Sequence, residues 1–290
     1  MHMKIVNSIE QLRKLLNRQV RQHRTVGFVP TMGFLHEGHL ALVKKAREEN
    51  DIVVMSIFVN PTQFGPNEDY ATYPRNEQRD VALAAEAGVD IVFMPDKDEM
   101  YPRIGEIQIL PGAQAEVLCG ASRSGHFDGV LKVILKLFNI VDPDRSYFGK
   151  KDAQQLAIIE TFVEDFNFRT TIERVPTVRE KDGLAMSSRN VRLSPKERSE
   201  APVLYEALQL GKKYLEQGKE TSVVEHEVAQ LIENKTSGAI DYVALLAYPS
   251  LQPLTVDSEE AILACAVTFE KARLIDNVIV KLKDELPCSE

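Results

Sequence analysis

The sequence is poor in cysteine and has no long apolar run. Its 3 cysteines, among 290 residues, are an odd number and lie far apart at Cys119, Cys265 and Cys288. This pattern argues against a disulfide framework and fits a reducing compartment, so we expect a cytoplasmic protein. The N-terminal segment carries charges where a secretory signal needs an apolar run. The longest apolar stretches, such as Ile52–Val59, fall far short of the ~20 residues that span a bilayer, so we expect no membrane partner.

Basic residues are also outnumbered, since 35 Lys and Arg face 43 Asp and Glu and give a formal net charge of −8. Binding to nucleic acid calls for a basic face, so this balance argues against a nucleic-acid partner. It leaves open an anionic small molecule, which needs only a local cluster of cations. The composition, 44% hydrophobic and 27% charged, is that of a globular protein, and the length predicts roughly two domains.

The first part of the chain alternates short apolar runs with helical patterns. Runs that are apolar throughout indicate strands buried on both faces, as in a parallel sheet covered by helices. The expected strands are residues 25–30, 52–59, 89–94, 145–148 and 169–175. The expected helices are residues 9–23, 40–50, 75–87, 130–141 and 152–166. This order predicts a doubly wound, Rossmann-like α/β domain.

The pattern changes after about residue 184. Ser194, Pro195 and Glu197 are typical of a helix start, and helical patterns continue to about Gly218 and over residues 222–234. Two strand-like runs follow, at 240–247 and 261–269. We therefore expect an N-terminal domain of residues 1–183 and a smaller α+β domain of residues 184–290. A hinge is expected at residues 181–183.

The first cluster able to carry chemistry is residues 30–39, PTMGFLHEGH. It joins a predicted strand to a predicted helix, where open α/β sheets bind ligands. Free backbone N–H groups and the helix dipole favour phosphate there, and His36 and His39 lie about one turn apart. Two other readings exist: a zinc site, for which the HExxH spacing would be expected, and a pair of surface histidines at a helix start.

The second cluster is residues 184–190, LAMSSRN, close to the expected domain boundary. Alone it would be typical of a solvated turn. Together with HxGH about 150 residues earlier, it resembles the two-part signature of the nucleotidyl-transferase superfamily, in which serine hydroxyls and a cation close over a triphosphate. That superfamily includes the class I aminoacyl-tRNA synthetases, where the second element usually reads KMSKS.

Further segments narrow the resemblance. SIFVNPTQF at residues 56–64 spans the end of the predicted strand 52–59, and KDAQQL at residues 151–156 follows the predicted strand 145–148. GHFDGV, KDGLAMSSRN and ARLIDN occur at residues 125–130, 181–190 and 272–277. Through these motifs, and in this order, nearly the whole chain resembles the pantoate–β-alanine ligase (pantothenate synthetase) family.

The resemblance implies a reaction in which ATP activates pantoate as pantoyl adenylate and β-alanine then displaces AMP. ATP is a substrate and Mg²⁺ accompanies it, with Asp152 as the expected carboxylate near the ion. It also implies a homodimer, with the C-terminal domain acting as a lid. By the same resemblance, catalysis falls to His39, His36, Lys151 and Arg189.

The resemblance also assigns the binding residues. ATP is expected at Met32, Gly33, Phe34, Leu35, His36, Glu37, Gly38, His39, Gly149, Lys150, Lys151, Asp152, Val178, Met186, Ser187, Ser188 and Arg189. Pantoate and β-alanine are expected at Gln63, Gln155, Asn60, Met32 and Arg123.

Two positions depart from the family pattern. Lys150 stands where the family usually has Glu, and Ser124 stands where it usually has Pro. Lys150 either points to solvent or changes nucleotide affinity, and Ser124 leaves the loop that carries Arg123 less rigid. Two other functions are weighed: a nucleotidylyltransferase of cofactor synthesis, and an RNA-binding fragment of a synthetase.

Overall fold

The structure is a computed structural model that describes residues 3–20, 22–66, 68–103 and 105–282. Contacts divide the chain into two compact units. Unit 1 comprises Met1–Gly112, Arg123–Lys150 and Ile158–Val178, and unit 2 comprises Ala113–Ser122, Lys151–Ala157 and Arg179–Glu290. The predicted domain boundary at residue 183 stays a prediction, and Cys288 lies outside the described residues.

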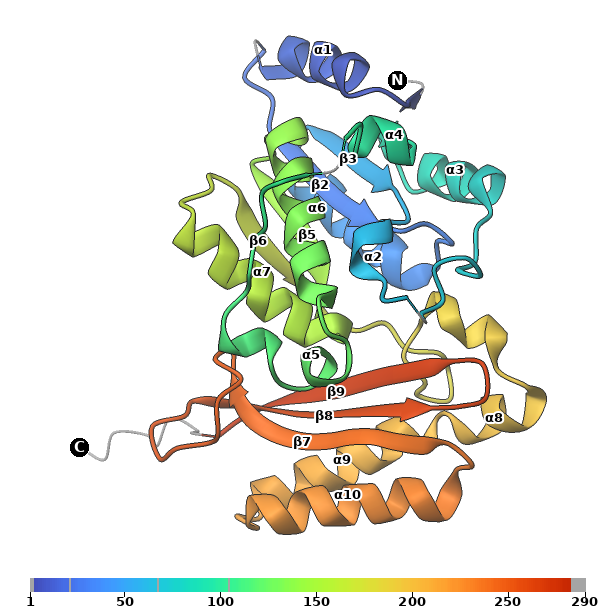
Figure 1. Cartoon of the computed structure of the whole chain (residues 1–290), viewed down its shortest axis with the longest axis vertical. Coiled ribbons are helices and arrows are strands. Elements are labelled where there is room, and N and C mark those ends of the chain that lie inside the picture. Colours follow the sequence, from blue (N-terminus) through green and yellow to red (C-terminus); the bar gives the residue numbers. More distant parts are fainter. Residues whose placement is uncertain (1–2, 21, 67, 104, 283–290) are drawn as a thin grey trace. The chain divides into compact units, whose positions relative to one another are not determined.

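Unit 1 is built on a parallel sheet of six strands in the described chain, ordered β1-β4-β3-β2-β5-β6 (Figure 1). The strands are β1 (Lys4–Val6), β2 (Val26–Thr31), β3 (Ile52–Ile57), β4 (Ile91–Phe93), β5 (Arg145–Gly149) and β6 (Thr171–Val175). All six residues of β3 are buried, as expected for a strand covered on both faces. The predicted Rossmann-like fold class is therefore confirmed.

The strand order reverses between β2 and β5, which are neighbours in the sheet. Helices of this part of the chain are α1 (Ile9–Val20), α2 (Glu37–Glu49), α3 (Glu77–Glu86), α4 (Lys97–Met100), α6 (His126–Val141) and α7 (Ala153–Asp165). Because crossovers between parallel strands are right-handed, the reversal places α2 and α3 on one face and α1 and α6 on the other. In open α/β sheets, ligands bind outside the carboxyl ends of the strands at such a reversal.

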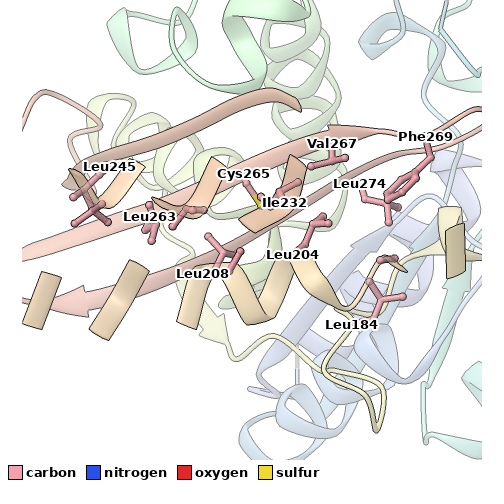
Figure 2. Packing of buried hydrophobic residues seen from close by; sticks show 14 of the residues in the cluster. Leu184, Leu204, Leu208, Ile232, Leu245, Leu263, Cys265, Val267, Phe269 and Leu274 are labelled. Atoms are coloured by element: carbon pink, nitrogen blue, oxygen red, sulfur yellow. The ribbon is translucent and has the colours of Figure 1, made fainter. Parts of the chain in front are cut away.

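Unit 2 contains an antiparallel sheet, β7 (Ala239–Tyr248), β8 (Glu260–Thr268) and β9 (Arg273–Lys281). Its helices are α5 (Cys119–Ser122), α8 (Pro195–Glu200), α9 (Val203–Glu216) and α10 (Thr221–Lys235). Figure 1 shows α9 and α10 running along this sheet, and Figure 2 shows leucines such as Leu204, Leu208 and Leu263 packed between helix and strand with Cys265. The predicted α+β character is confirmed.

The predicted element ends needed several corrections. Helix α2 begins at Glu37 and not at Leu40, and α6 begins at His126 and not at Val130, because Gly125 in the left-handed region (φ 77°) starts it. Strands β1 and β9 and the short helices α4 and α5 were not predicted. The helix start at Ser194 is confirmed, since Ser194 and Glu197 form a capping box on α8. Among the described residues, no helix is both long and apolar enough to cross a membrane.

Candidate active site

The turn between β2 and α2 carries the HxGH motif at the carboxyl edge of the sheet. Gly33 and Phe34 both lie in the left-handed region, with φ of 81° and 50°. This conformation is strained for Phe34, so the surrounding structure must hold it. A Cβ on Gly33 would lie 3.0 Å from both Asp80 Oδ2 and Ile57 Cγ2, so a side chain there would be tight as well as strained.

Asp80 on α3 is the group that holds this turn. Its carboxylate, 1% exposed, accepts hydrogen bonds from the backbone N–H groups of Phe34 and Leu35, both at 2.7 Å. The neighbouring Arg79 donates to the Leu35 carbonyl at 2.7 Å and lies over the Phe34 ring. Two consecutive amides on one buried carboxylate fix the direction in which the chain enters α2.

His36 and His39 close the N-terminus of α2 as a capping box. Nδ1 of His36 accepts from the N–H of Gly38 at 3.1 Å, and Nδ1 of His39 accepts from the N–H of His36 at 3.3 Å. The two ring centroids are 4.1 Å apart. An accepting Nδ1 carries no proton, so each neutral ring carries its proton on Nε2 and offers that atom as a donor.

The sequence pattern predicts free backbone N–H groups at this helix start, and the structure corrects this prediction. The amides of Phe34 and Leu35 are bound to Asp80, that of Gly38 to His36, and that of His39 to the His36 carbonyl at 2.8 Å. Donors for a phosphate here are therefore mainly the imidazoles rather than the amides. Leu35 itself is fully buried in the core, so its side chain has a structural role.

Asn60 and Gln63 lie after β3, around the short helix η1 (Pro61–Gln63). Asn60, 1% exposed, donates from Nδ2 to Gln63 Oε1 and to the Gly129 carbonyl, both at 3.1 Å. Its Oδ1 accepts from the Tyr101 hydroxyl at 2.8 Å. With its oxygen committed to Asn60, the Gln63 amide turns Nε2 toward Met32, 3.1 Å from Sδ. The network thus presents Gln63 as a hydrogen-bond donor beside Met32.

The backbone behind Gln63 is held by α6. The His126 ring nitrogen Nδ1 lies 2.7 Å from the Gln63 carbonyl, and its Nε2 lies 2.9 Å from Arg123 Nη1. Arg123 also donates to both carboxylate oxygens of Glu68. Burial alone would raise the pKa of Glu68, but the Arg123 hydrogen bonds and charge outweigh it and hold that pKa below its ordinary value.

Helix α6 approaches η1 closely at Gly129. A Cβ at this position would lie 2.1 Å from the Thr62 carbonyl oxygen and 2.6 Å from Gln63 Cα. Only glycine allows this approach without moving the backbone that carries Gln63. Burial raises the pKa of the Tyr101 phenol in the same region, so this hydroxyl stays protonated as the donor to Asn60.

A cavity of about 160 Å³ lies beside this network in unit 1. It is lined by the turn at Met32–Phe34, by the end of β3, and by side chains from the segment after η1 that include Tyr70 and Arg75. The structure therefore puts Met32 between the cavity and the Gln63 amide.

The remaining predicted residues of unit 1 follow the strands on the other side of β2. Gly149 ends β5, which pairs with β2, and Lys150 follows it directly. Lys150 is half-buried, as is Val178 beyond the end of β6. The HxGH turn, η1 and Gly149 thus lie at the carboxyl ends of β2, β3 and β5, which are neighbours in the sheet.

Unit 2 holds the second group of predicted residues. Lys151 Nζ lies 3.3 Å from Asp152 Oδ1, and the Lys151 carbonyl accepts from Asn277 Nδ2 at 2.8 Å. Gln155 is half-buried, whereas the neighbouring Gln154 is buried and bonded to three backbone groups, among them the N–H of Cys119. Gln154 therefore has a structural role.

The Met186–Arg189 segment follows a tight turn in unit 2. Arg179 pairs with Ala185, and Gly183 (φ 95°) closes the turn between them. Ser187 caps the short helix η4 (Ser188–Arg192) by accepting from the Arg189 N–H at 3.2 Å. The first serine hydroxyl is thus used to shape the loop, which the sequence motif alone did not indicate.

Several residues that position the site were missed by the sequence argument. Asp80 and Tyr101 have no motif of their own, and each is connected to the site only through folding. Asp276 and Asn277 belong to the ARLIDN motif, but the motif gave no role for them. Among the described residues, no group of three or more His, Cys, Asp and Glu side chains is placed to hold a metal ion.

Comparisons with known proteins all match this chain to one family. The family model for pantoate-beta-alanine ligase matches residues 4–279. Pantothenate synthetase of Lysinibacillus sphaericus is 55% identical over 285 residues, covering 98% of this chain and 100% of the relative. Pantothenate synthetase of Bacillus subtilis is 51% identical over 282 residues, covering 97% of this chain and 99% of the relative.

Solved structures agree with the sequence comparisons. Pantothenate synthetase from Thermus thermophilus matches with a TM-score of 0.90 and 46% identity, over 95% of this chain and 99% of that one. Pantoate-beta-alanine ligase from Francisella tularensis, complexed with beta-gamma ATP and beta-alanine, matches with a TM-score of 0.78 and 37% identity. That match covers 96% of this chain and 97% of the neighbour.

Proposed function

The chain belongs to the pantoate–β-alanine ligase family, and we propose that the residues described above are its catalytic and binding machinery. It is an ATP-dependent ligase that joins pantoate and β-alanine by an amide bond. The single observation that carries this function is the full-length match to pantothenate synthetases at 55% identity. The structure supports it by assembling the HxGH turn and the Gln63 amide on one edge of the sheet.

The reaction has two steps that balance without a covalent enzyme intermediate. A pantoate carboxylate oxygen attacks the α-phosphorus of ATP, the bond to the bridging oxygen breaks, and pyrophosphate leaves. The β-alanine amine then attacks the acyl carbon of pantoyl adenylate, and AMP leaves with the former carboxylate oxygen. The amine loses one proton in this step. The enzyme accelerates both steps by orientation and by stabilising charge on phosphate.

In the first step the two histidines act on the phosphates. Their Nδ1 atoms accept backbone N–H bonds, so their Nε2–H groups are the donors for phosphate oxygens. His39, whose ring is fixed by the backbone of His36, donates to the transferring phosphate, and His36 assists it. Charge that develops on the phosphate in the transition state strengthens these hydrogen bonds.

The cations and hydroxyls of unit 2 complete the nucleotide site. Lys151 neutralises phosphate charge, and Arg189 does the same from the Met186–Arg189 segment. Ser188 donates to phosphate oxygens, while Ser187 shapes the loop. The backbone at Gly149, Lys150 and Val178 contacts the nucleotide. These assignments agree with the general rule that ligands of open α/β sheets bind at the carboxyl ends of the strands.

Pantoate and β-alanine bind beside Met32. The Gln63 amide is fixed by Asn60 so that Nε2 is the donating end, which suits a hydroxyl or carboxylate oxygen. A neutral donor orients the carboxylate without forming an ion pair that would weaken it as a nucleophile. Gln155 is the second amide of this site, and Arg123, whose charge is already paired with Glu68, completes it.

Magnesium fits the donor set as an ion that arrives with ATP. Mg²⁺ in such enzymes is held by substrate phosphates and one or two carboxylates, not by a cage of protein ligands. Asp152, exposed and beside Lys151, is the carboxylate that fits this description. When bound, the ion would neutralise phosphate charge.

Assembly, location and domain movement are further parts of the proposal. The protein is a homodimer in the cytoplasm, and residues 184–290 act as a lid over ATP bound by residues 1–183, hinged at 181–183. Light scattering on the purified protein measures the oligomer. Small-angle scattering with and without a non-hydrolysable ATP analogue and pantoate measures closure, for which a smaller radius with ligand is expected.

One assay tests the function. Release of AMP from ATP is measured with pantoate, with β-alanine, with both and with neither. Rapid AMP release is expected only with both acids, and pantothenate should form in equal amount. AMP release with neither acid, or none with both, contradicts the ligase function.

A further inference from the structure

The ARLIDN motif places two polar residues, Asp276 and Asn277, in the middle of strand β9. Both are buried, with exposures of 4% and 8%. Polar side chains inside a strand are costly unless they are fully bonded, so their presence calls for a specific partner. Asn277 is bonded to Lys151, which the proposed function assigns to ATP binding, and Asp276 is bonded to Arg179, which precedes the Met186–Arg189 segment.

Asp276 binds Arg179, which begins the turn of residues 179–185 that precedes the Met186–Arg189 segment. Its carboxylate accepts two hydrogen bonds from Arg179, at 2.6 and 2.9 Å, in a bidentate ion pair. The Arg179 guanidinium also donates to the Gly183 carbonyl and lies over the Tyr205 ring, 3.6 Å from its centroid. A planar guanidinium bound on its edge and stacked on its face has little freedom.

Asn277 binds the backbone at Lys151. Its Nδ2 donates to the backbone carbonyl of Lys151 at 2.8 Å. Its own backbone N–H donates to Asp276 Oδ1 at 2.8 Å, so the two side chains are linked through the strand. All of these residues belong to unit 2. Lys151 is therefore bonded to Asn277 and Arg179 to Asp276, which are adjacent residues of strand β9.

We propose that Asp276 and Asn277 are positioning residues that hold Lys151 and the Met186–Arg189 segment in register for ATP, a role that rests on the proposed function. Neither needs to touch the nucleotide. Strand β9 pairs along its whole length with β8, which is itself almost entirely buried, and so provides a rigid base. Displacing a phosphate-binding cation by about 1 Å can lower a rate by as much as about 100-fold.

The first test replaces Asn277 by Asp and, separately, by Ala. Asn277→Asp keeps the shape but removes the N–H that reaches the Lys151 carbonyl. Both variants are expected to raise the dissociation constant and KM of ATP about 10-fold or more. The rate at which added pantoyl adenylate reacts with β-alanine should stay within about twofold, because that step needs no triphosphate contact.

Asn139 provides a matched control. Its Nδ2 donates to the Leu135 carbonyl at 2.8 Å, the same kind of bond, but on the exposed surface of α6. Asn139→Asp and Asn139→Ala should leave ATP binding and both half-reactions unchanged. A purely structural role of Asn277 would instead lower both half-reactions together, in proportion to the folded fraction found by thermal unfolding.

A double-mutant cycle shows whether Asn277 acts through Lys151. Lys151→Ala alone should weaken ATP binding. Adding Asn277→Ala to this variant should lower ATP affinity much less than Asn277→Ala lowers it in the wild type. Additive effects, or an unchanged ATP affinity in Asn277→Asp, would overturn the proposal.

Asp276→Asn, which leaves Arg179 without its charged partner, should weaken ATP binding as well. Normal ATP affinity in this variant counts against the role of Asp276. If the wild-type protein forms no pantothenate, the proposed function itself fails, which is a separate result.

Discussion

His36 and His39 are bonded to one another through the backbone of the turn that carries them: the N–H of His36 donates to Nδ1 of His39 at 3.3 Å. This bond uses Nδ1 of His39 as an acceptor, so the proton of the neutral ring lies on Nε2. The two histidines therefore shape the site and also supply its donors.

Replacing His39 by Ala tests the catalytic function. Pantoate-dependent exchange of pyrophosphate into ATP should fall by about 100-fold or more, because a donor to the transferring phosphate is lost. Stability should fall by only about 1 kcal/mol, the usual effect of losing a cap. His226→Ala, on the exposed surface of α10, is the control and should leave the exchange rate unchanged. Normal exchange in His39→Ala contradicts the role given to this histidine.

Replacing Asp80 by Ala tests the anchoring of the turn. Two backbone N–H groups lose a buried acceptor, so the free energy of unfolding should fall by about 2–3 kcal/mol in urea titrations. Because the left-handed Phe34 is then no longer held, the adenylation rate should fall as well. Glu86→Ala, at the exposed end of the same helix, should change stability by less than about 0.5 kcal/mol. Equal stabilities for the two variants would show that Asp80 does not anchor the turn.

Replacing Gly129 by Ala tests the link between α6 and the Gln63 amide. The added Cβ would lie 2.1 Å from the Thr62 carbonyl oxygen, so the helix and η1 must separate. We expect a loss of about 1–3 kcal/mol in stability and a higher KM for pantoate, with the KM of ATP less affected. Gly112→Ala is the matched control, because nothing lies within 4 Å of a Cβ there. A pantoate KM equal to that of the wild type would disconnect Gly129 from the pantoate site.

The Glu68–Arg123 pair predicts a dependence of stability on pH. The folded-state pKa of Glu68 lies below its ordinary value of about 4.3 because of Arg123, so the unfolded chain binds the proton more tightly. The stability from this pair is therefore fully present above that ordinary value and is lost as the pH falls through the lower, folded pKa. Urea unfolding from pH 7 to pH 3 should show that the free energy of unfolding of the wild type exceeds that of Glu68→Gln by about 1 kcal/mol at pH 7. This difference should disappear in acid. A difference in the free energy of unfolding that stays constant with pH means that the Glu68–Arg123 pair does not cause it.

Much of unit 1 could be predicted because its signals are local. Strand β3 is apolar at nearly every position, and such a run is typical of a buried parallel strand. The HxGH turn was placed correctly between β2 and α2. The start of α2 was placed three residues late, because His36 is an unusual cap that works only with His39 as its partner.

The missed parts depend on contacts that are distant in the sequence. Strand β9 was not predicted because Asp276 and Asn277 interrupt its apolar pattern, and the partner of Asp276 is Arg179, 97 residues earlier. Asp80 looks in the sequence like any acidic residue of an amphipathic helix. Its burial follows from the turn at Phe34, 46 residues earlier. No periodicity or motif reports such pairs.

The central claim is that pantoate is activated by joining its carboxylate to the α-phosphate of ATP. The most direct measurement uses pantoate labelled with ¹⁸O in both carboxylate oxygens, with mass spectrometry of the products. One labelled oxygen should appear in AMP and one in the amide carbonyl of pantothenate. AMP without label, or label in inorganic phosphate together with ADP, would contradict the adenylate route.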